Sequence, residues 1–226
     1  MTCILASSRS GYEKIVKRLS GETGERFICF TSNEELTARV LNEVKPTYVF
    51  FPHWSYIIPE DIYTHFECVM FHMTDLPFGR GGSPLQNLIA RGIYETQITA
   101  FRCEKGLDTG PIYCKRPLSL YGVAEEIYMR AADIIEDMIK WIIANQPEPV
   151  PQQGEGCYFP RRKAEESNIA ELESLQKLYD YIRMLDAEGY PRAFLETKHF
   201  RIEFERASLK PDYIKADVTI CEKQEE

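Results

Sequence analysis

Two short segments hold the residue types that carry out proton transfer. The segment FHMTDLPFGRGGSP at 71–84 contains a histidine, an arginine and three glycines, and GLDTGPI at 106–112 places an aspartate in a turn. Histidine exchanges a proton near neutral pH, and a carboxylate beside it stabilises the charged ring. Taken singly, the histidine is more often a structural hydrogen-bonding residue and the aspartate a turn cap. The pair together favours a chemical site.

The elements that must position this pair form an alternating pattern. Apolar runs at 2–6, 26–30, 47–51 and 68–71 predict strands, and helical periodicity separates them. Strands joined through helices predict an open, mostly parallel α/β sheet. His72 follows the fourth run, at the carboxyl end where such sheets bind ligands. The first turn, ASSRSG at 6–11, has one glycine, which disfavours a nicotinamide or flavin cofactor.

The second half of the chain predicts further elements. Two strands are expected around the GLDTG turn, followed by a long helix at about 122–144. The Pro- and Gly-rich stretch 146–163 is typical of a surface linker. Beyond it we expect a helix at 171–186, a strand at 200–207 and a frayed tail, CEKQEE. A catalytic domain at 1–160 and a small C-terminal α+β extension at 161–226 are therefore predicted.

Composition excludes several classes of protein. The 226 residues include 35 acidic and 27 basic side chains, and the net charge of −8 argues against a nucleic-acid partner. Seven scattered cysteines without a CxxC pair favour neither a disulfide framework nor a zinc site, so no metal is expected. No apolar run approaches 18 residues, so no membrane partner is expected. These features predict a cytoplasmic protein.

The two motifs together resemble a known family. HMTDLPFGRGGSP at 72–84 and TQITAFRCEKGLDTGPIY at 96–113 are similar to the formyltransferases that use N10-formyltetrahydrofolate. The resemblance implies a Rossmann-like formyltransferase fold with His72 and Asp108 as catalytic residues. The family asparagine, two positions before the histidine, falls on Met70 in this chain. A thioether cannot donate the hydrogen bond that an amide gives to the formyl oxygen.

The chemistry of an amine attacking a formyl group defines the expected roles. His72 is expected to act as general base or proton shuttle, and Asp108 to orient it and stabilise the imidazolium. The developing oxyanion must then be stabilised by His72, by backbone N–H groups near the glycines, or by Asn87 or Thr74. If none of these acts, the protein is a catalytically dead binding protein.

The resemblance also implies binding residues. Those expected around the pterin of N10-formyltetrahydrofolate are Ser55, Tyr56, Ile57, Ile58, Cys103 and Glu104. Those expected to bind the acceptor are Ser8, Arg9, Arg80, Gly81 and Gly82. Arg161, Arg162 and Lys163 form the one basic run, either a diphosphate contact or a solvated linker.

The acceptor is expected to be a nucleotide-linked 4-amino-4,6-dideoxy sugar. FHMTDLPFGRGGSPLQNLI at 71–89 looks especially like the sugar N-formyltransferases of pseudaminic acid pathways, which implies UDP-4-amino-4,6-dideoxy-N-acetyl-altrosamine. The net charge and the short C-terminal part disfavour tRNA. Alternatives are a peptide-synthetase-type or aminoacyl formyltransferase and a formyltetrahydrofolate hydrolase. The family also implies a homodimer, with the helix at 171–186 as its expected contact.

Overall fold

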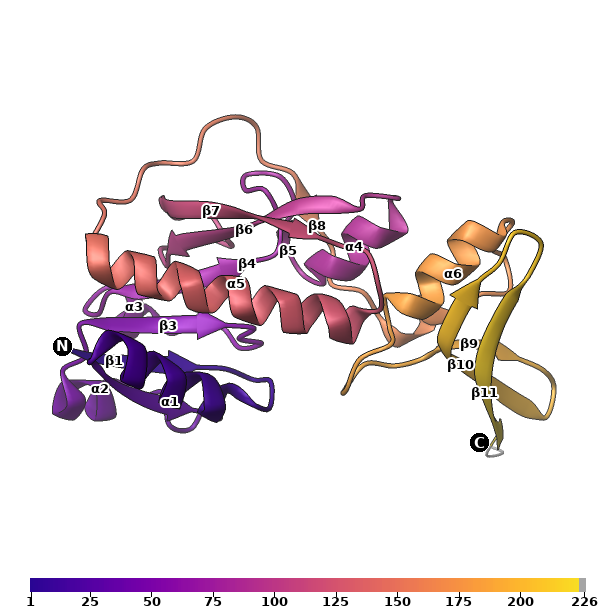
Figure 1. Cartoon of the computed structure of the whole chain (residues 1–226), viewed down its shortest axis with the longest axis horizontal. Helices are drawn as coiled ribbons and strands as arrows, with labels where there is room; N and C mark the ends of the chain where they lie inside the picture. The colour runs from indigo at the N-terminus through magenta and orange to yellow at the C-terminus, as the bar shows by residue number, and fades with distance from the viewer. Residues whose placement is uncertain (224–226) are drawn as a thin grey trace. The chain divides into compact units, whose positions relative to one another are not determined.

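A six-stranded sheet forms the centre of the computed structural model, which describes residues 1–223 (Figure 1). Its strands are β1 (Thr2–Ala6), β2 (Arg26–Phe30), β3 (Tyr48–Pro52), β4 (Cys68–His72), β6 (Glu95–Arg102) and β7 (Ile112–Ser119). The spatial order is β2-β1-β3-β4-β6-β7. The first four strands are parallel and β6 runs antiparallel to β4, so the expected mostly parallel α/β sheet is confirmed.

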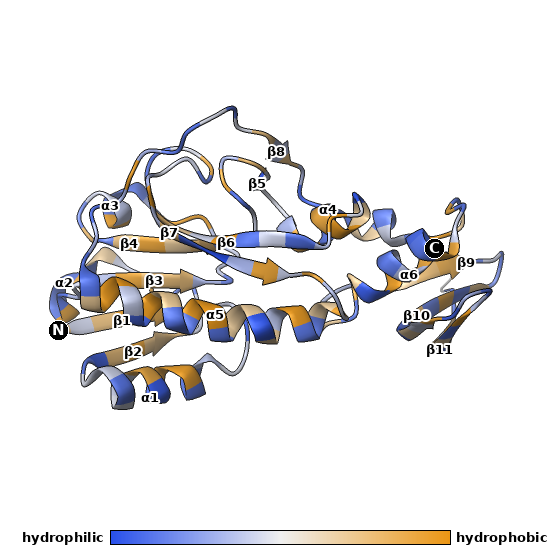
Figure 2. Ribbon diagram, turned by 45° about the horizontal axis from the view of Figure 1, so that its top comes forward, coloured by the Kyte–Doolittle hydropathy of each residue, from blue (hydrophilic) through white to orange (hydrophobic). Residues whose placement is uncertain are grey.

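The parallel strands are built from residues that are apolar on both faces. Every residue of β3 is buried, as expected for a strand covered on both sides. Figure 2 shows β1, β3 and β4 as largely hydrophobic ribbons. Their side chains join a buried cluster that includes Phe51, Trp54, Ile58 and Cys103. The core therefore lies directly beneath the loops that leave the carboxyl ends of β3 and β4.

The helices are α1 (Tyr12–Thr23), α2 (Ala38–Val44), α3 (Glu60–Tyr63), α4 (Pro84–Ala90), α5 (Ala124–Asn145) and α6 (Leu175–Arg183), with a 3₁₀ turn η1 (Ala164–Ser167). The long helix α5 is confirmed. Thr37 caps α2 through its hydroxyl, which accepts from the amide of Val40. The carboxylate of Glu35 accepts from the amides of Thr31 and Ser32. Ser83 is the N-cap residue of α4, but its hydroxyl makes no cap hydrogen bond and accepts instead from the amide of Arg162.

An ion pair links two helices that lie on the same face of the sheet. The Arg18 guanidinium of α1 binds the Glu136 carboxylate of α5, which is only 3% exposed, through Nε at 2.8 Å. Lys140 also approaches Glu136, at 3.6 Å. A buried carboxylate needs such partners, because an unpaired charge in the interior is strongly destabilising. The pair therefore fixes α1 beside α5 on the sheet (Figure 1).

A three-stranded antiparallel sheet follows in the C-terminal part. It consists of β9 (Ala193–Glu196), β10 (Phe200–Leu209) and β11 (Ile214–Glu222), in the order β11-β10-β9. The expected strand at 200–207 is thus confirmed and extends to a hairpin. Cys221 and Glu222 belong to β11, so the tail is not frayed there, and residues 224–226 lie outside the described part of the chain.

The chain divides into two compact units made of interleaved segments. One unit contains residues 1–81, 97–118 and 131–158, and the other contains 82–96, 119–130 and 159–226. The last boundary between the two units, after residue 158, lies close to the predicted domain boundary at 160. The second unit also contains the two earlier segments 82–96 and 119–130. The division into a catalytic domain and an extension stays a prediction. Among residues 1–223, no helix is long and apolar enough to cross a bilayer.

Gly110 lies in the turn between β6 and β7, and its substitution tests how closely this turn is packed. A Cβ at this position would lie 1.8 Å from the carbonyl oxygen of Arg102. We expect Gly110→Ala to lower the free energy of unfolding by about 1–3 kcal/mol, because the backbone must shift. Urea denaturation followed by circular dichroism measures the change.

The matched control is Gly21→Ala within α1, where nothing lies within 4 Å of the new Cβ. Here alanine favours the helix, so stability should rise by about 0.5–1 kcal/mol. Equal effects of the two substitutions would contradict the proposed close packing.

Candidate active site

His72 and Asp108 meet at the carboxyl edge of the parallel strands. His72 ends β4, and its ring is buried at 7% exposure. The Nδ1 atom lies 3.8 Å from Oδ2 of Asp108. Asp108 itself has a left-handed φ of 53°, which an aspartate tolerates better than most residues. The structure thus brings together the two residues expected to be catalytic.

The imidazole has a defined tautomer. Its Nε2 atom lies 2.8 Å from the carbonyl oxygen of Gly79. A carbonyl oxygen only accepts hydrogen bonds, so Nε2 carries the hydrogen and Nδ1 of the neutral ring carries the lone pair. The carbonyl of Gly79 therefore sets the tautomer of the ring. The lone pair of Nδ1 lies on the side of the ring that is nearest the Asp108 carboxylate.

The glycine-rich turn holds the aspartate in place. The amide of Gly81 donates to Oδ2 of Asp108 at 2.8 Å. Gly79 and Gly81 both have positive φ values, 73° and 104°, which glycine adopts without steric cost. This bend of the backbone directs the Gly79 carbonyl towards Nε2 of His72 and the Gly81 amide towards Oδ2 of Asp108. Gly81 thus holds the Asp108 carboxylate through its backbone amide, and its expected role in acceptor binding stays a prediction.

Arg80 and Gly82 have internal contacts of their own. The guanidinium of Arg80 donates to Oε1 of Gln152 through Nε at 3.2 Å and Nη2 at 2.7 Å. A Cβ on Gly82 would lie 2.6 Å from the Cα of Arg161. Glycine is thus required at 82 by a close approach of two backbone segments. The assignment of both residues to acceptor binding stays a prediction.

The loops after β1 and β3 are tied together at the same edge of the sheet. The amide of Ser55 donates to the Ser8 hydroxyl at 3.0 Å, and the Ser8 amide donates to the carbonyl of His53 at 3.3 Å. The strand order reverses between β1 and β3, and such switch points open the crevice where α/β sheets bind ligands. Arg9 follows in the β1 loop, with its amide bonded to the hydroxyl of Ser7 at 3.2 Å.

The six residues expected around the pterin divide into two groups. Ile58 and Cys103 are 8% and 7% exposed and belong to the core cluster. Burial raises the pKa of the Cys103 thiol well above its ordinary value, as for an inert core cysteine. Tyr56 and Ile57 are 50% and 92% exposed. Ser55 and Glu104 are exposed as well, so four of the six residues are accessible to solvent.

Neither residue suggested as a replacement for the family asparagine is available. The Asn87 amide donates to the carbonyls of Gly82, Ser83 and Pro160, which marks it as structural. The hydroxyl of Thr74, fully buried, donates to Gly79 at 3.3 Å. Met70 packs against the core cluster. Of the expected oxyanion stabilisers, His72 and the backbone N–H groups near the glycines remain, and their role stays a prediction.

Gln152 is a site residue that sequence reasoning missed. It lies in the stretch expected to be a surface linker, yet it is half-buried against Asp108 and Arg80. No local signal marks it, because a glutamine between proline-rich residues is typical of a solvated loop. Among residues 1–223, no group of three or more histidine, cysteine, aspartate or glutamate side chains is placed to hold a metal ion.

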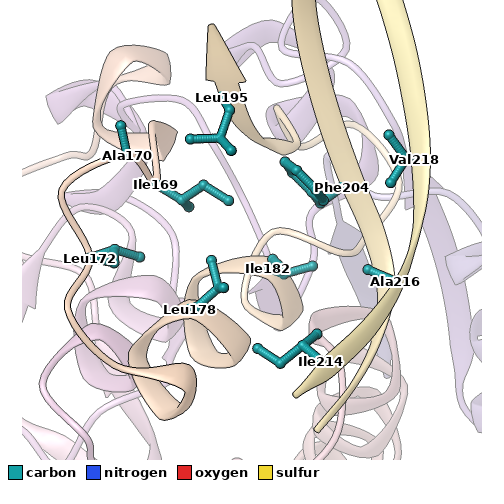
Figure 3. A pocket seen from close by; sticks show the side chains of 10 residues that line it. All are labelled: Ile169, Ala170, Leu172, Leu178, Ile182, Leu195, Phe204, Ile214, Ala216 and Val218. Atoms are coloured by element: carbon teal, nitrogen blue, oxygen red, sulfur yellow. The ribbon is translucent and has the colours of Figure 1, made fainter. Parts of the chain in front are cut away.

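An apolar pocket of about 410 Å³ lies within the second compact unit (Figure 3). Side chains of α6, β9, β10 and β11 line it, and all ten lining residues are apolar. It contains no group for proton transfer. The homodimer contact expected near α6 stays a prediction.

Comparison with known proteins identifies the relatives of this fold. A solved methionyl-tRNA formyltransferase from Clostridium thermocellum is 50% identical, with a TM-score of 0.96, over 99% of this chain and 100% of that chain. The chain belongs to the formyltransferase family. Members of this family are one-carbon transferases that use N10-formyltetrahydrofolate. The expected formyltransferase family and its fold are thereby confirmed.

Further matches are weaker but agree with this one. The family model for the C-terminal domain of methionyl-tRNA formyltransferase matches residues 164–221. Curated methionyl-tRNA formyltransferases of Rickettsia massiliae and Wolinella succinogenes are 28% and 26% identical over 79% and 73% of this chain. The chain spans only 59% and 55% of their lengths.

These matches correct the acceptor expected from the sequence. The structure of the sugar formyltransferase PseJ from Anoxybacillus kamchatkensis is only 19% identical, with a TM-score of 0.60 over 74% of this chain and 89% of that chain, so it shows the fold alone. The nucleotide-linked amino sugar and the exclusion of nucleic acid are therefore wrong. The expected acceptor rested on the short segment 71–89, and the expected absence of nucleic acid rested on the net charge of the whole chain.

His53, in the loop after β3, is expected to make the stability of the protein depend on pH. Burial, and then the positive charge of Arg9, lower the pKa of His53 from 6.5 to about 3. The unfolded chain therefore binds one more proton than the folded chain between these values. We expect the free energy of unfolding to fall as pH decreases from 6.5 towards 3, by up to about 1.4 kcal/mol per pH unit from this residue.

The His53→Gln variant should lose stability less steeply than the wild type across that range of pH. Urea denaturation at several pH values measures the slope. His199→Gln, which removes an exposed imidazole, serves as the control and should follow the wild type. If the free energies of unfolding of the wild type and His53→Gln changed with pH at the same slope, the lowered pKa of His53 would be contradicted.

Proposed function

We propose that this chain transfers the formyl group of N10-formyltetrahydrofolate to the amino group of methionine carried on tRNA. The observation that carries the proposal is the 50% identity to the Clostridium thermocellum methionyl-tRNA formyltransferase along the full length of that structure. The curated relatives of the same name support it. We also propose a cytoplasmic location, where tRNA is charged, in keeping with seven free cysteines.

The arrangement at the sheet edge suits proton transfer during acyl transfer. The attacking amine must lose a proton, and Nδ1 of His72 carries the lone pair that accepts it. The Asp108 carboxylate, 3.8 Å away, stabilises the imidazolium that results. The proton can then be returned to the leaving nitrogen of the donor. His72 is buried and Asp108 is half-buried, which strengthens their electrostatic interaction relative to water.

The edge of the sheet also offers exposed apolar surface to the ring of the donor. Tyr56 and Ile57 expose apolar surface in the loop after β3, and Pro52 at the end of that strand is paired with Phe71 beside His72. A pterin ring covering this surface would remove it from water, which favours binding. A fold relative, HypX of Aquifex aeolicus, was solved with tetrahydrofolic acid, at 16% identity and a TM-score of 0.74 over 91% of this chain and 37% of that chain.

A tRNA acceptor requires cations near the site rather than a positive net charge. Phosphate contacts are local, and each depends on one or two basic side chains. The run Arg161–Lys163 immediately precedes the segment matched by the family model. Arg162 lies over the ring of Tyr181 at 5.3 Å, whereas Arg161 and Lys163 are exposed. These two exposed cations are our candidates for contacts with the acceptor stem.

The reaction is tested by incubating the protein with N10-formyltetrahydrofolate and methionyl-tRNA, and following formylmethionine and tetrahydrofolate. We expect product only when both substrates are present. His72→Asn and Asp108→Asn should remain folded and lose about 10²–10⁴-fold in kcat, because proton transfer is removed. Release of tetrahydrofolate without tRNA would instead indicate a hydrolase, and full activity of either variant would reject its catalytic role.

The tRNA contacts are tested by the double variant Arg161→Gln/Lys163→Gln. We expect KM for methionyl-tRNA to rise about tenfold and the salt dependence of binding to weaken by up to about two units of slope, with kcat unchanged. Lys14→Gln/Lys17→Gln, which removes two exposed cations from α1, is the control of equal charge. Identical KM values for the two double variants would remove the basic run from the acceptor site.

A further inference from the structure

The side-chain amide of Gln152 uses all of its hydrogen-bonding capacity beside the catalytic pair. Its Nε2 donates to the carbonyl of Asp108 at 2.9 Å and to the carbonyl of Gly110 at 2.8 Å. Its Oε1 accepts from Nε and Nη2 of Arg80. An amide offers two N–H donors and an oxygen with two lone pairs, so no further bond can form. Such saturation is typical of a group that fixes its neighbours.

These bonds connect the two turns that form the site. Arg80 directly precedes Gly81, whose amide holds the carboxylate of Asp108. Gln152 holds the backbone carbonyl of the same aspartate. Asp108 is thus fixed at both its side chain and its main chain, and both contacts lead to residues 80 and 81. The left-handed φ of 53° at Asp108 needs such support, because a non-glycine residue there is strained.

We propose that Gln152 is a positioning residue of the His72–Asp108 pair. Its donor half locks the Asp108 turn, and its acceptor half anchors Arg80 and thereby the glycine-rich turn that holds the Asp108 carboxylate. Loss of the donor half lets the carboxylate move away from Nδ1 of His72. Its effect on turnover rests on the proposed function, whereas its effect on the geometry does not.

The variant Gln152→Glu separates the two halves. A carboxylate keeps the acceptor contact to Arg80 and adds a charge to it, but it has no N–H to donate to Asp108 and Gly110. We expect kcat to fall about 10–100-fold, the loss typical of a catalytic group displaced by about 1 Å, while KM for the formyl donor changes less than twofold. Thermal stability should fall slightly, because the carbonyls of Asp108 and Gly110 lose their donors while the contact to Arg80 gains a charge. A merely structural glutamine would lower stability and leave the kcat of the folded protein unchanged.

Two comparisons make the assignment specific. Gln153→Glu introduces the same charge at the adjacent exposed residue and should leave kcat unchanged. In an Asp108→Asn background, Gln152→Glu should have no further effect on kcat, because Gln152 acts through Asp108. Additive losses in the double variant would overturn the proposal. Gln152→Ala, which removes both halves, should lower kcat at least as far as Gln152→Glu.

A measurement without substrate distinguishes this proposal from the proposed function. The chain has four histidines, so the ring ¹⁵N spectrum is simple, and His72→Gln identifies the His72 signals. At one fixed pH, Gln152→Glu and Gln152→Ala should move the Nδ1 signal of His72 in the direction seen for Asp108→Asn, whereas Gln153→Glu should not. An unmoved signal overturns the positioning role even if the wild type forms product. A moved signal supports it even if no acceptor is formylated.

Discussion

The geometry of the site depends on one hydrogen bond, from the Gly81 amide to the carboxylate of Asp108. It joins the turn that follows β4 to the turn that follows β6. The strands β4 and β6 are antiparallel neighbours in the sheet. Without it, the carboxylate of Asp108 would have no fixed place relative to the imidazole of His72. The two glycines with positive φ, the close packing of Gly110 and the contacts of Gln152 all restrict the same two turns. The sheet thus supplies a rigid base, and backbone groups supply the final alignment.

Much of this could be predicted from the sequence because strong local patterns carry it. Apolar runs identify the parallel strands, and the position of His72 at the end of one run follows directly. The resemblance supplied Asp108, which lies 36 residues further along the chain and which no local pattern pairs with His72. The tautomer could not be predicted, since it depends on the carbonyl of Gly79 reaching Nε2. Nor could Gln152, whose contacts lie 42 to 72 residues away.

The acceptor shows where sequence reasoning was wrong in physical terms. A net charge of −8 is a sum over the chain, whereas phosphates respond mainly to charges within about 8 Å at physiological ionic strength. Acidic residues elsewhere, such as those paired with Arg18 and Lys140 on the helices, have no bearing on a distant phosphate contact. The resemblance to sugar enzymes rested on the segment 71–89 alone, which is a small part of the chain. The identity to the methionyl-tRNA formyltransferase extends over 99% of the chain and therefore outweighs it.

The interleaved units have a consequence for synthesis on the ribosome. Tyr94 donates to Asp180, which emerges 86 residues later, and the hydroxyl of Tyr128 pairs with that of Tyr190 across 62 residues. Buried Arg183, which holds the carbonyls of Leu120 and Gly122, is also made long after its partners. The second unit therefore cannot complete its folding until residue 190 has been translated. Until then its earlier segments, 82–96 and 119–130, lack these polar partners. A nascent chain arrested before that point presents these segments to chaperones and proteases.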